Sequence, residues 1–81
     1  MSRYAVLNDY DPHAPERVGY VLSIHATKAN AQAAVARAQT RCRVLSLVPS
    51  LAIVTLHRAA HVGDYMRKIE VTIHETFVPV Q

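Results

Sequence analysis

One segment of this sequence, from Lys28 to about Arg41, is long enough and suitably patterned to form a helix of several turns. Thr27 comes directly before it and is a favourable N-cap, because its hydroxyl can accept a backbone N–H of the first turn. At about 100° per residue, a stripe of small side chains follows one face and would let the helix lie close to a sheet. That stripe comprises Ala31, Ala34, Val35, Ala38 and Cys42.

Most of the remaining sequence has the alternating or β-branched character of strands. We expect strands at residues 3–8, 19–26, 43–48, 51–58 and 67–78, with a connection at residues 59–65. In the second strand, the parity predicts that one face points to the core. That face carries Tyr20, Leu22, Ile24 and Ala26.

The last expected strand has the clearest pattern, with one apolar face and one polar face. Its apolar face carries Ile69, Val71, Ile73 and Phe77. Glu75 is the exception, because its parity places it among these apolar residues. Either a bulge shifts the register there, or Glu75 meets a cation such as Arg3 or Arg43.

The chain has 81 residues, which corresponds to one domain spanning residues 1–81. A chain of this length buries only about 60–65% of the surface that it exposes when unfolded. A thin core favours one sheet with one covering helix over a layered fold. We therefore predict an α+β fold in β-β-α-β-β-β order, with an Ala-rich helix packed on one face of an antiparallel sheet of about four or five strands. Such a fold has little room for a deep catalytic pocket unless a dimer builds one between subunits.

The charge distribution is uneven: residues 17–63 contain no Asp and no Glu. The net charge is +3, and cations in this window predict an anionic partner or pairing with the acidic flanks of the chain. Five of them are candidate partner-binding residues, because they could form a patch where the helix ends and the next strand begins. They are Lys28, Arg37, Arg41, Arg43 and Arg58.

The face of the helix opposite the core stripe carries alanine where an exposed face normally carries charge. Ala33 and Ala36 lie at its centre. One interpretation is a second buried side, covered by a protein partner or by a second copy in a homodimer. The other is a solvated face, because Ala is the best helix former.

Two groups of residues have the types that bind metal ions. His57 and His61 are four residues apart and Asp64 is three further on, a spacing that would gather them on one side of a helix. His57 is expected to end a strand, which breaks that geometry. The carboxylate oxygens of Asp9 and Asp11 are of the kind that hard cations prefer. Asp is also common in turns, which explains these residues without a metal ion. We predict no metal and no cofactor.

Several functional classes are excluded or disfavoured by the sequence. Gly19 and Gly63 are the only glycines, so neither the Walker loop nor the dinucleotide-binding loop is present. Cys42 is the only cysteine, so no disulfide forms within the chain, which fits a reducing cytoplasm. The longest apolar stretch, residues 44–56, is shorter than the about 20 residues of a membrane-spanning helix.

Three functional hypotheses follow, and the first is favoured. It is a non-enzymatic protein-binding module that covers an acidic or nucleic-acid-handling surface of its partner. Small α+β proteins of this character are typical of phages and mobile elements, and many inhibit host machinery stoichiometrically, anti-CRISPR proteins among them. This analogy concerns size and character only. The alternatives are a nucleic-acid-binding module that uses the arginine patch, and a small metal protein or enzyme built on His57, His61 and Asp64.

Overall fold

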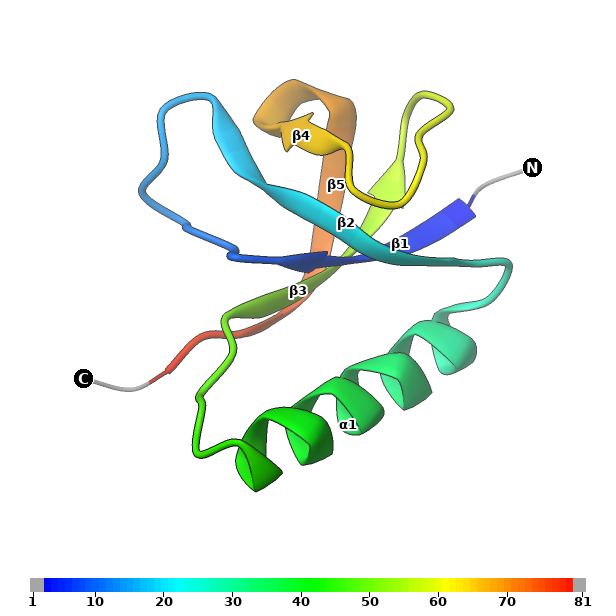
Figure 1. Cartoon of the computed structure of the whole chain (residues 1–81). Helices are drawn as coiled ribbons and strands as arrows, with labels where there is room; N and C mark the ends of the chain where they lie inside the picture. Colours follow the sequence, from blue (N-terminus) through cyan, green and yellow to red (C-terminus); the bar gives the residue numbers. More distant parts are fainter. Residues whose placement is uncertain (1–2, 80–81) are drawn as a thin grey trace.

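The computed structural model describes residues 3–79 and contains one long helix and a five-stranded antiparallel sheet (Figure 1). The strand order is β4-β2-β1-β3-β5, which places the first strand at the centre. The expected α+β class, the β-β-α-β-β-β order and the helix on one face are confirmed, although the strands after the helix differ in position from those expected. The elements are β1 (Arg3–Asn8), β2 (Arg17–His25), α1 (Lys28–Val44), β3 (Leu51–Leu56), β4 (Tyr65–Arg67), a 3-10 turn η1 (Lys68–Glu70) and β5 (Val71–Phe77).

The sheet is strongly curled, because its two edge strands are joined by η1 alone. The Lys68 N–H donates to the Glu16 carbonyl next to β2, at 3.0 Å. The His57 N–H, just beyond β3, donates to the Glu70 carbonyl at 2.8 Å. The turn therefore holds both sides of the sheet, and Figure 1 shows β4 and β5 meeting above the central strands. The result is a partly closed barrel.

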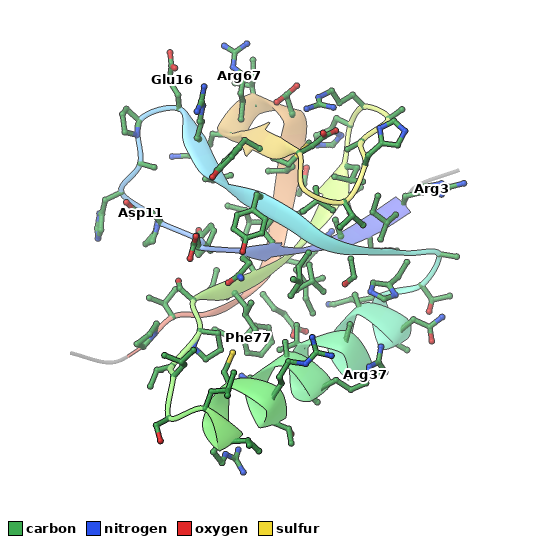
Figure 2. The ribbon with its side chains drawn as sticks, viewed as in Figure 1. Arg3, Asp11, Glu16, Arg37, Arg67 and Phe77 are labelled. Atoms are coloured by element: carbon green, nitrogen blue, oxygen red, sulfur yellow. The ribbon has the colours of Figure 1, made fainter. Side chains whose placement is uncertain are left out.

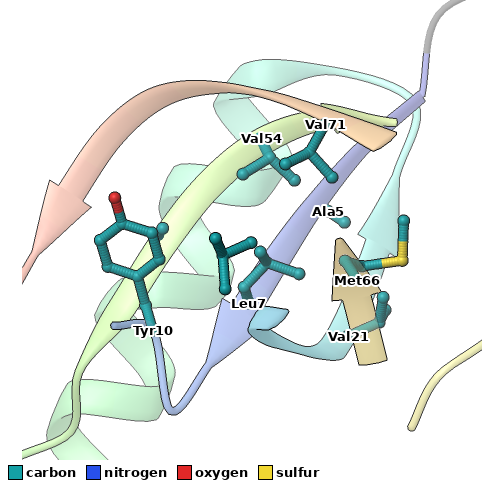
Figure 3. Packing of buried hydrophobic residues seen from close by; sticks show 9 residues of the cluster. Ala5, Leu7, Tyr10, Val21, Val54, Met66 and Val71 are labelled. Carbon is teal, nitrogen blue, oxygen red and sulfur yellow. The ribbon is translucent and has the colours of Figure 1, made fainter. Parts of the chain in front are cut away.

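The barrel interior forms the larger of two apolar clusters (Figure 3). Met66 from β4 and Val71 from β5 belong to it together, although their strands are at opposite edges of the sheet. Burial of this cluster removes apolar surface from water and supplies the main stabilising term of the fold. Its buried members are Ala5, Leu7, Tyr10, Val18, Val21, Ala52, Val54, Met66 and Val71.

The second cluster lies between α1 and the outer face of the sheet. It contains four of the five residues of the predicted helix stripe: Ala31, Ala34 and Val35 are buried, and Ala38 packs against them. Cys42, the fifth, is only partly buried and lies outside this cluster. The Thr27 side chain accepts the Asn30 N–H at 3.1 Å, which confirms the predicted N-cap. Within residues 3–79, no helix combines the length and apolar character needed to cross a membrane.

The expected strand at residues 43–48 is wrong. The helix continues to Val44, and residues 45–50 form an irregular connection to β3. The helix ends where Ser46 adopts a left-handed conformation with φ of 59°. The N–H groups of Ser46 and Leu47 then donate to the carbonyls of Arg43 and Cys42, at 3.0 and 2.7 Å. This double closure is the Schellman pattern that satisfies the last carbonyls of a helix.

The expected strand at residues 67–78 is only partly correct. Its first part forms the end of β4 and then η1, and β5 begins at Val71. Ile69 is therefore 77% exposed instead of buried, because it lies in the 3-10 turn that connects the two edges. The observed second strand begins two residues earlier than expected, since β2 starts at Arg17.

A bulge in β5 resolves the exceptional parity of Glu75. Ile53 pairs with Glu75 and Val54 pairs with Ile73, so His74 is the extra residue. Of the two expected alternatives, the bulge is present, and it also turns Phe77 toward α1, away from the barrel interior that Ile73 contacts. The carboxylate of Glu75 meets Lys28 and Gln32, not Arg3 or Arg43.

A second register shift, in the β1–β2 pair, separates residues that the sequence placed on one face of β2. Leu22 packs against the helix cluster, whereas Ile24 packs against the barrel interior. Tyr20 is only half buried, and its hydroxyl accepts a hydrogen bond from the Asn8 side chain at 2.8 Å. The predicted single core face of this strand is therefore wrong.

Candidate functional site

Among residues 3–79, two of the five predicted partner-binding cations have carboxylate partners and three do not. Lys28, in the first turn of α1, lies 3.5 Å from the Glu75 carboxylate. Arg58 lies beyond the far end of β3, where its Nε donates to Glu70 and its Nη1 lies 3.8 Å from Asp64. Arg58 is therefore separated from the arginines of the helix, contrary to the single patch that the sequence predicted.

Arg37, Arg41 and Arg43 are exposed on the second half of α1 (Figure 2 labels Arg37). Within residues 3–79, none of the three lies within 4.0 Å of a carboxylate. The pKa of His25 lies below its ordinary value, first because the imidazole is partly buried and second because of the Arg37 charge. The three arginines carry positive charge that this part of the chain leaves unbalanced.

The residues directly after this cluster are apolar and exposed. Val44 is 80% exposed, Leu45 63%, Leu47 58% and Val48 75%. The left-handed turn at Ser46 reverses the chain here, so these side chains point to solvent instead of entering the sheet. We call Arg37, Arg41, Arg43, Val44, Leu45, Leu47 and Val48 the helix-end surface.

A groove of about 420 Å³ lies beside this surface. Its lining includes Arg43, Leu47 and Val48, together with Phe77 at the end of β5 and Val78 just after it. Figure 2 shows Phe77 between the helix and the end of the sheet, where it packs against the helix cluster. The groove thus has an apolar floor and a guanidinium at its rim.

Ala33 and Ala36 are exposed on the outer face of α1. At about 100° per residue, they share a stripe with Arg37, Arg41 and Val44. No other part of residues 3–79 covers this stripe, because the core contacts of α1 are made by its opposite face. The helix therefore offers a smooth outer face that continues into the apolar end.

The histidines of the metal hypothesis lie at one end of the barrel. The His57 Nε2 lies 2.5 Å from the Thr72 hydroxyl, and the His61 Nδ1 lies 3.9 Å from the Asp64 carboxylate. Within the described part of the chain, no group of three or more His, Cys, Asp or Glu side chains is arranged to hold a metal ion. These histidines line an open cleft of about 730 Å³ with Arg3 and Arg58, and the partners of Arg58 balance its charge.

The side chains of Asn8, at the end of β1, and of Asp11 stabilise the turn that follows. The Asn8 side chain accepts the Asp9 N–H at 2.8 Å, and the Asp11 carboxylate accepts the His13 N–H at 2.9 Å. Contacts between a side chain and the backbone that follows it are typical of turns, so they support the turn interpretation of these residues over a cation site.

Glu70 gives a testable pH dependence. The Arg67 N–H and the Arg58 guanidinium donate to its carboxylate and hold the pKa of Glu70 below its usual value. The folded state thus favours the ionised form, and this stabilisation is present at neutral pH and lost as pH falls through the lowered pKa. The lowered pKa of His25 acts in the same direction, because acid must charge an imidazole that the fold prefers neutral.

We expect the melting temperature of the wild type to fall steadily on acidification below neutral pH. Glu70→Gln should have a lower melting temperature at pH 7 and a flatter profile in acid, because the lost interaction no longer titrates. Glu16→Gln is the matched control, since the Glu16 side chain makes no ion pair among residues 3–79. Scanning calorimetry across pH measures both profiles, and a Glu70→Gln profile parallel to the wild type would contradict this account.

The helix-end surface combines charge, apolar exposure and a groove, and sequence reasoning found only its arginines. The exposed apolar residues were missed because an apolar run ordinarily signals burial. A comparison of this chain with protein-family models, curated proteins and solved structures finds no match.

Proposed function

We propose that this protein is a non-enzymatic binding module that attaches to a partner protein through the helix-end surface. The observation that supports this most strongly is the run of exposed apolar side chains from Val44 to Val48 beside arginines that lack carboxylate partners within residues 3–79. Contiguous exposed apolar patches are uncommon on soluble monomers and mark interaction sites. The partner therefore carries an apolar site bordered by Asp or Glu.

The proportions of this surface suit a protein interface. Interfaces have an apolar centre and a polar rim, and arginine is enriched in them. Here Leu47 and Val48 form the centre, and Arg41 and Arg43 provide bidentate donors for carboxylates at the rim. The groove beside Phe77 would accept one apolar side chain of the partner.

Nucleic-acid binding by the same arginines has less support. Single-stranded nucleic acids are held by aromatic platforms as well as by cations. The apolar residues of the helix-end surface are aliphatic, and burying them against phosphates would leave no gain from apolar contact. The aliphatic centre therefore favours a protein partner.

The proposed mechanism is occlusion. The module binds stoichiometrically in the cytoplasm and covers an acidic or nucleic-acid-handling surface of its partner, so that the natural ligand of that surface is excluded. This is the mode of action expected of a small inhibitor encoded by a phage or mobile element. The smooth outer stripe of α1, with Ala33 and Ala36, would extend the covered area.

The proposal is tested by affinity capture from a lysate of the source cell followed by reconstitution. The tag belongs at the N-terminus, because Val78 near the other end lines the groove. We expect a protein that the wild type retains and that Leu47→Asp or the double variant Arg41→Glu/Arg43→Glu loses. The purified pair should then bind with a 1:1 ratio, and the double charge reversal should weaken it by about 100-fold, because like charges face each other.

Control variants keep this experiment decisive. Arg58→Gln changes an arginine outside the helix-end surface and should leave the affinity within about twofold. Sedimentation at increasing concentration measures self-association. A homodimer that Leu47→Asp dissociates would assign the surface to a second copy and contradict the proposal, as would a complex that is insensitive to both helix-end variants.

A further inference from the structure

Two arginines face each other across the β2–β4 ladder. Arg17 of β2 and Arg67 of β4 are direct partners in the antiparallel register. Like charges in opposed positions on neighbouring strands repel and destabilise the pair. Lys68 follows directly and is exposed as well. The protein therefore concentrates three cations where sheet stability alone favours opposite charges.

The two arginines lie on the outside of the barrel. Met66, between Tyr65 and Arg67, is fully buried in the interior, so its two neighbours in β4 point outward. Within residues 3–79, neither arginine nor Lys68 lies within 4.0 Å of a carboxylate. Glu16 is next to Arg17 in sequence, and Figure 2 shows it with Arg67 at the same end of the molecule. Glu70 is also close, because its carboxylate accepts the Arg67 N–H, but it is already paired with Arg58. Arg17, Arg67 and Lys68 therefore outnumber the nearby carboxylates that are not already paired.

Two tyrosines lie next to these cations on the same ladder. Tyr20 pairs with Tyr65, and their ring centroids are 5.7 Å apart in an edge-to-face arrangement. Tyr65 is 57% exposed, and the Arg17 guanidinium lies 5.4 Å from its ring centroid. The Asn8 side chain holds the Tyr20 hydroxyl, which fixes the inner ring and leaves Tyr65 outermost.

We propose that this β2–β4 face, formed by Arg17, Tyr20, Tyr65, Arg67 and Lys68, binds single-stranded nucleic acid. A backbone phosphate bridges Arg17 and Arg67 and removes their mutual repulsion. An adjacent base stacks on Tyr65, and Lys68 contacts the next phosphate. This site is separate from the helix-end surface, so it goes beyond the proposed protein-binding function.

The combination of residues favours a nucleic acid over a phosphorylated peptide. A phosphopeptide needs one anion site, whereas the cations here extend from the β2–β4 pair to η1 and flank an exposed ring. Alternating anion and ring contacts match the alternating phosphates and bases of a single strand. A duplex offers no free base face, so it should bind less tightly.

Fluorescence anisotropy with a labelled oligothymidylate of about twelve nucleotides tests the proposal. We expect a Kd of about 1–100 μM at low salt. The slope of log affinity against log salt should be about −1.4 to −2.1, as expected when two or three phosphates are contacted. Arg17→Glu should weaken binding by at least about tenfold, and Tyr65→Ala by about 5- to 100-fold, because a stacking partner is lost.

Arg17→Glu also has a second readout that separates binding from folding. It places opposite charges across the ladder, so the melting temperature should stay at or above that of the wild type while oligonucleotide binding is lost. If this variant does not fold, Arg67→Gln serves the same purpose. A lower melting temperature together with unchanged oligonucleotide affinity would assign the pair a purely structural role and overturn the proposal.

Further measurements test which surface binds the oligonucleotide and which class of ligand is preferred. Arg41→Glu/Arg43→Glu should retain wild-type oligonucleotide affinity, and a loss in this variant would move the site to the helix and overturn the proposal. A duplex of the same length and a phosphoserine peptide are measured in parallel. Tighter binding of either, or no binding of the single strand, would also overturn it.

Discussion

Gly19→Ala is expected to remove a large part of the stability of this protein. Gly19 has a φ of +153°, and an added Cβ would lie 2.7 Å from the Asn8 carbonyl oxygen and 3.3 Å from the Leu7 Cβ. The first contact is with the backbone of the central strand, which cannot move without breaking its pairing. Conformational strain and overpacking together should cost about 2–5 kcal/mol. A domain of this size has a free energy of unfolding of about 4–12 kcal/mol.

Gly63→Ala separates the two causes of this loss. Gly63 also has a positive φ, +94°, but no heavy atom lies within 4 Å of an added Cβ. It should therefore show the cost of strain alone, about 1–3 kcal/mol. Urea denaturation of both variants measures the difference. Equal losses in the two variants would show that the contact with β1 contributes nothing.

Met66→Ala is expected to have the second largest effect, a loss of about 2–5 kcal/mol. Met66 is fully buried and is the only interior residue that the three-residue strand β4 supplies to the barrel cluster. Its truncation leaves a cavity in the barrel cluster, and it also removes the main apolar anchor of this edge. Equilibrium denaturation gives the change in the free energy of unfolding.

Ile69→Ala is the control for Met66→Ala, because it removes a similar apolar side chain three residues away. Ile69 is 77% exposed in η1, so its truncation should change stability by less than about 0.5 kcal/mol. A larger loss of stability for Ile69→Ala than for Met66→Ala would mean that Ile69 is buried, as the sequence pattern predicted, and would contradict the curled sheet described above.

Local rules explain the parts of the fold that the sequence predicts well. The Thr27 cap and the spacing of Ala31, Ala34 and Val35 depend only on neighbours within a few turns, and both are confirmed. Strand β1 has the predicted bounds, and the bulge is one of the two alternatives that the exceptional parity of Glu75 predicted. Each of these features is visible in a short window of sequence.

The errors arise where distant contacts decide the outcome. Val44 to Val48 has the apolar character of a strand, yet the helix cap at Ser46 keeps it outside the sheet. Ile69 has core parity, but closing the sheet requires a turn at that point. The same limit applies to the candidate sites: the opposition of Arg17 and Arg67 depends on a strand register that composition and spacing do not specify.

The turn η1 also determines when the barrel interior can be buried during synthesis of the chain. β1, β2, α1 and β3 leave the ribosome first and can form an open half-shell, with Leu7 and Val54 facing water on its inner side. The segment from Tyr65 to Phe77 emerges later and supplies both missing edge strands, β4 next to β2 and β5 next to β3. A nascent chain stalled before this segment would therefore expose the apolar residues of its inner face to water. Such a surface promotes aggregation and is the kind that chaperones bind.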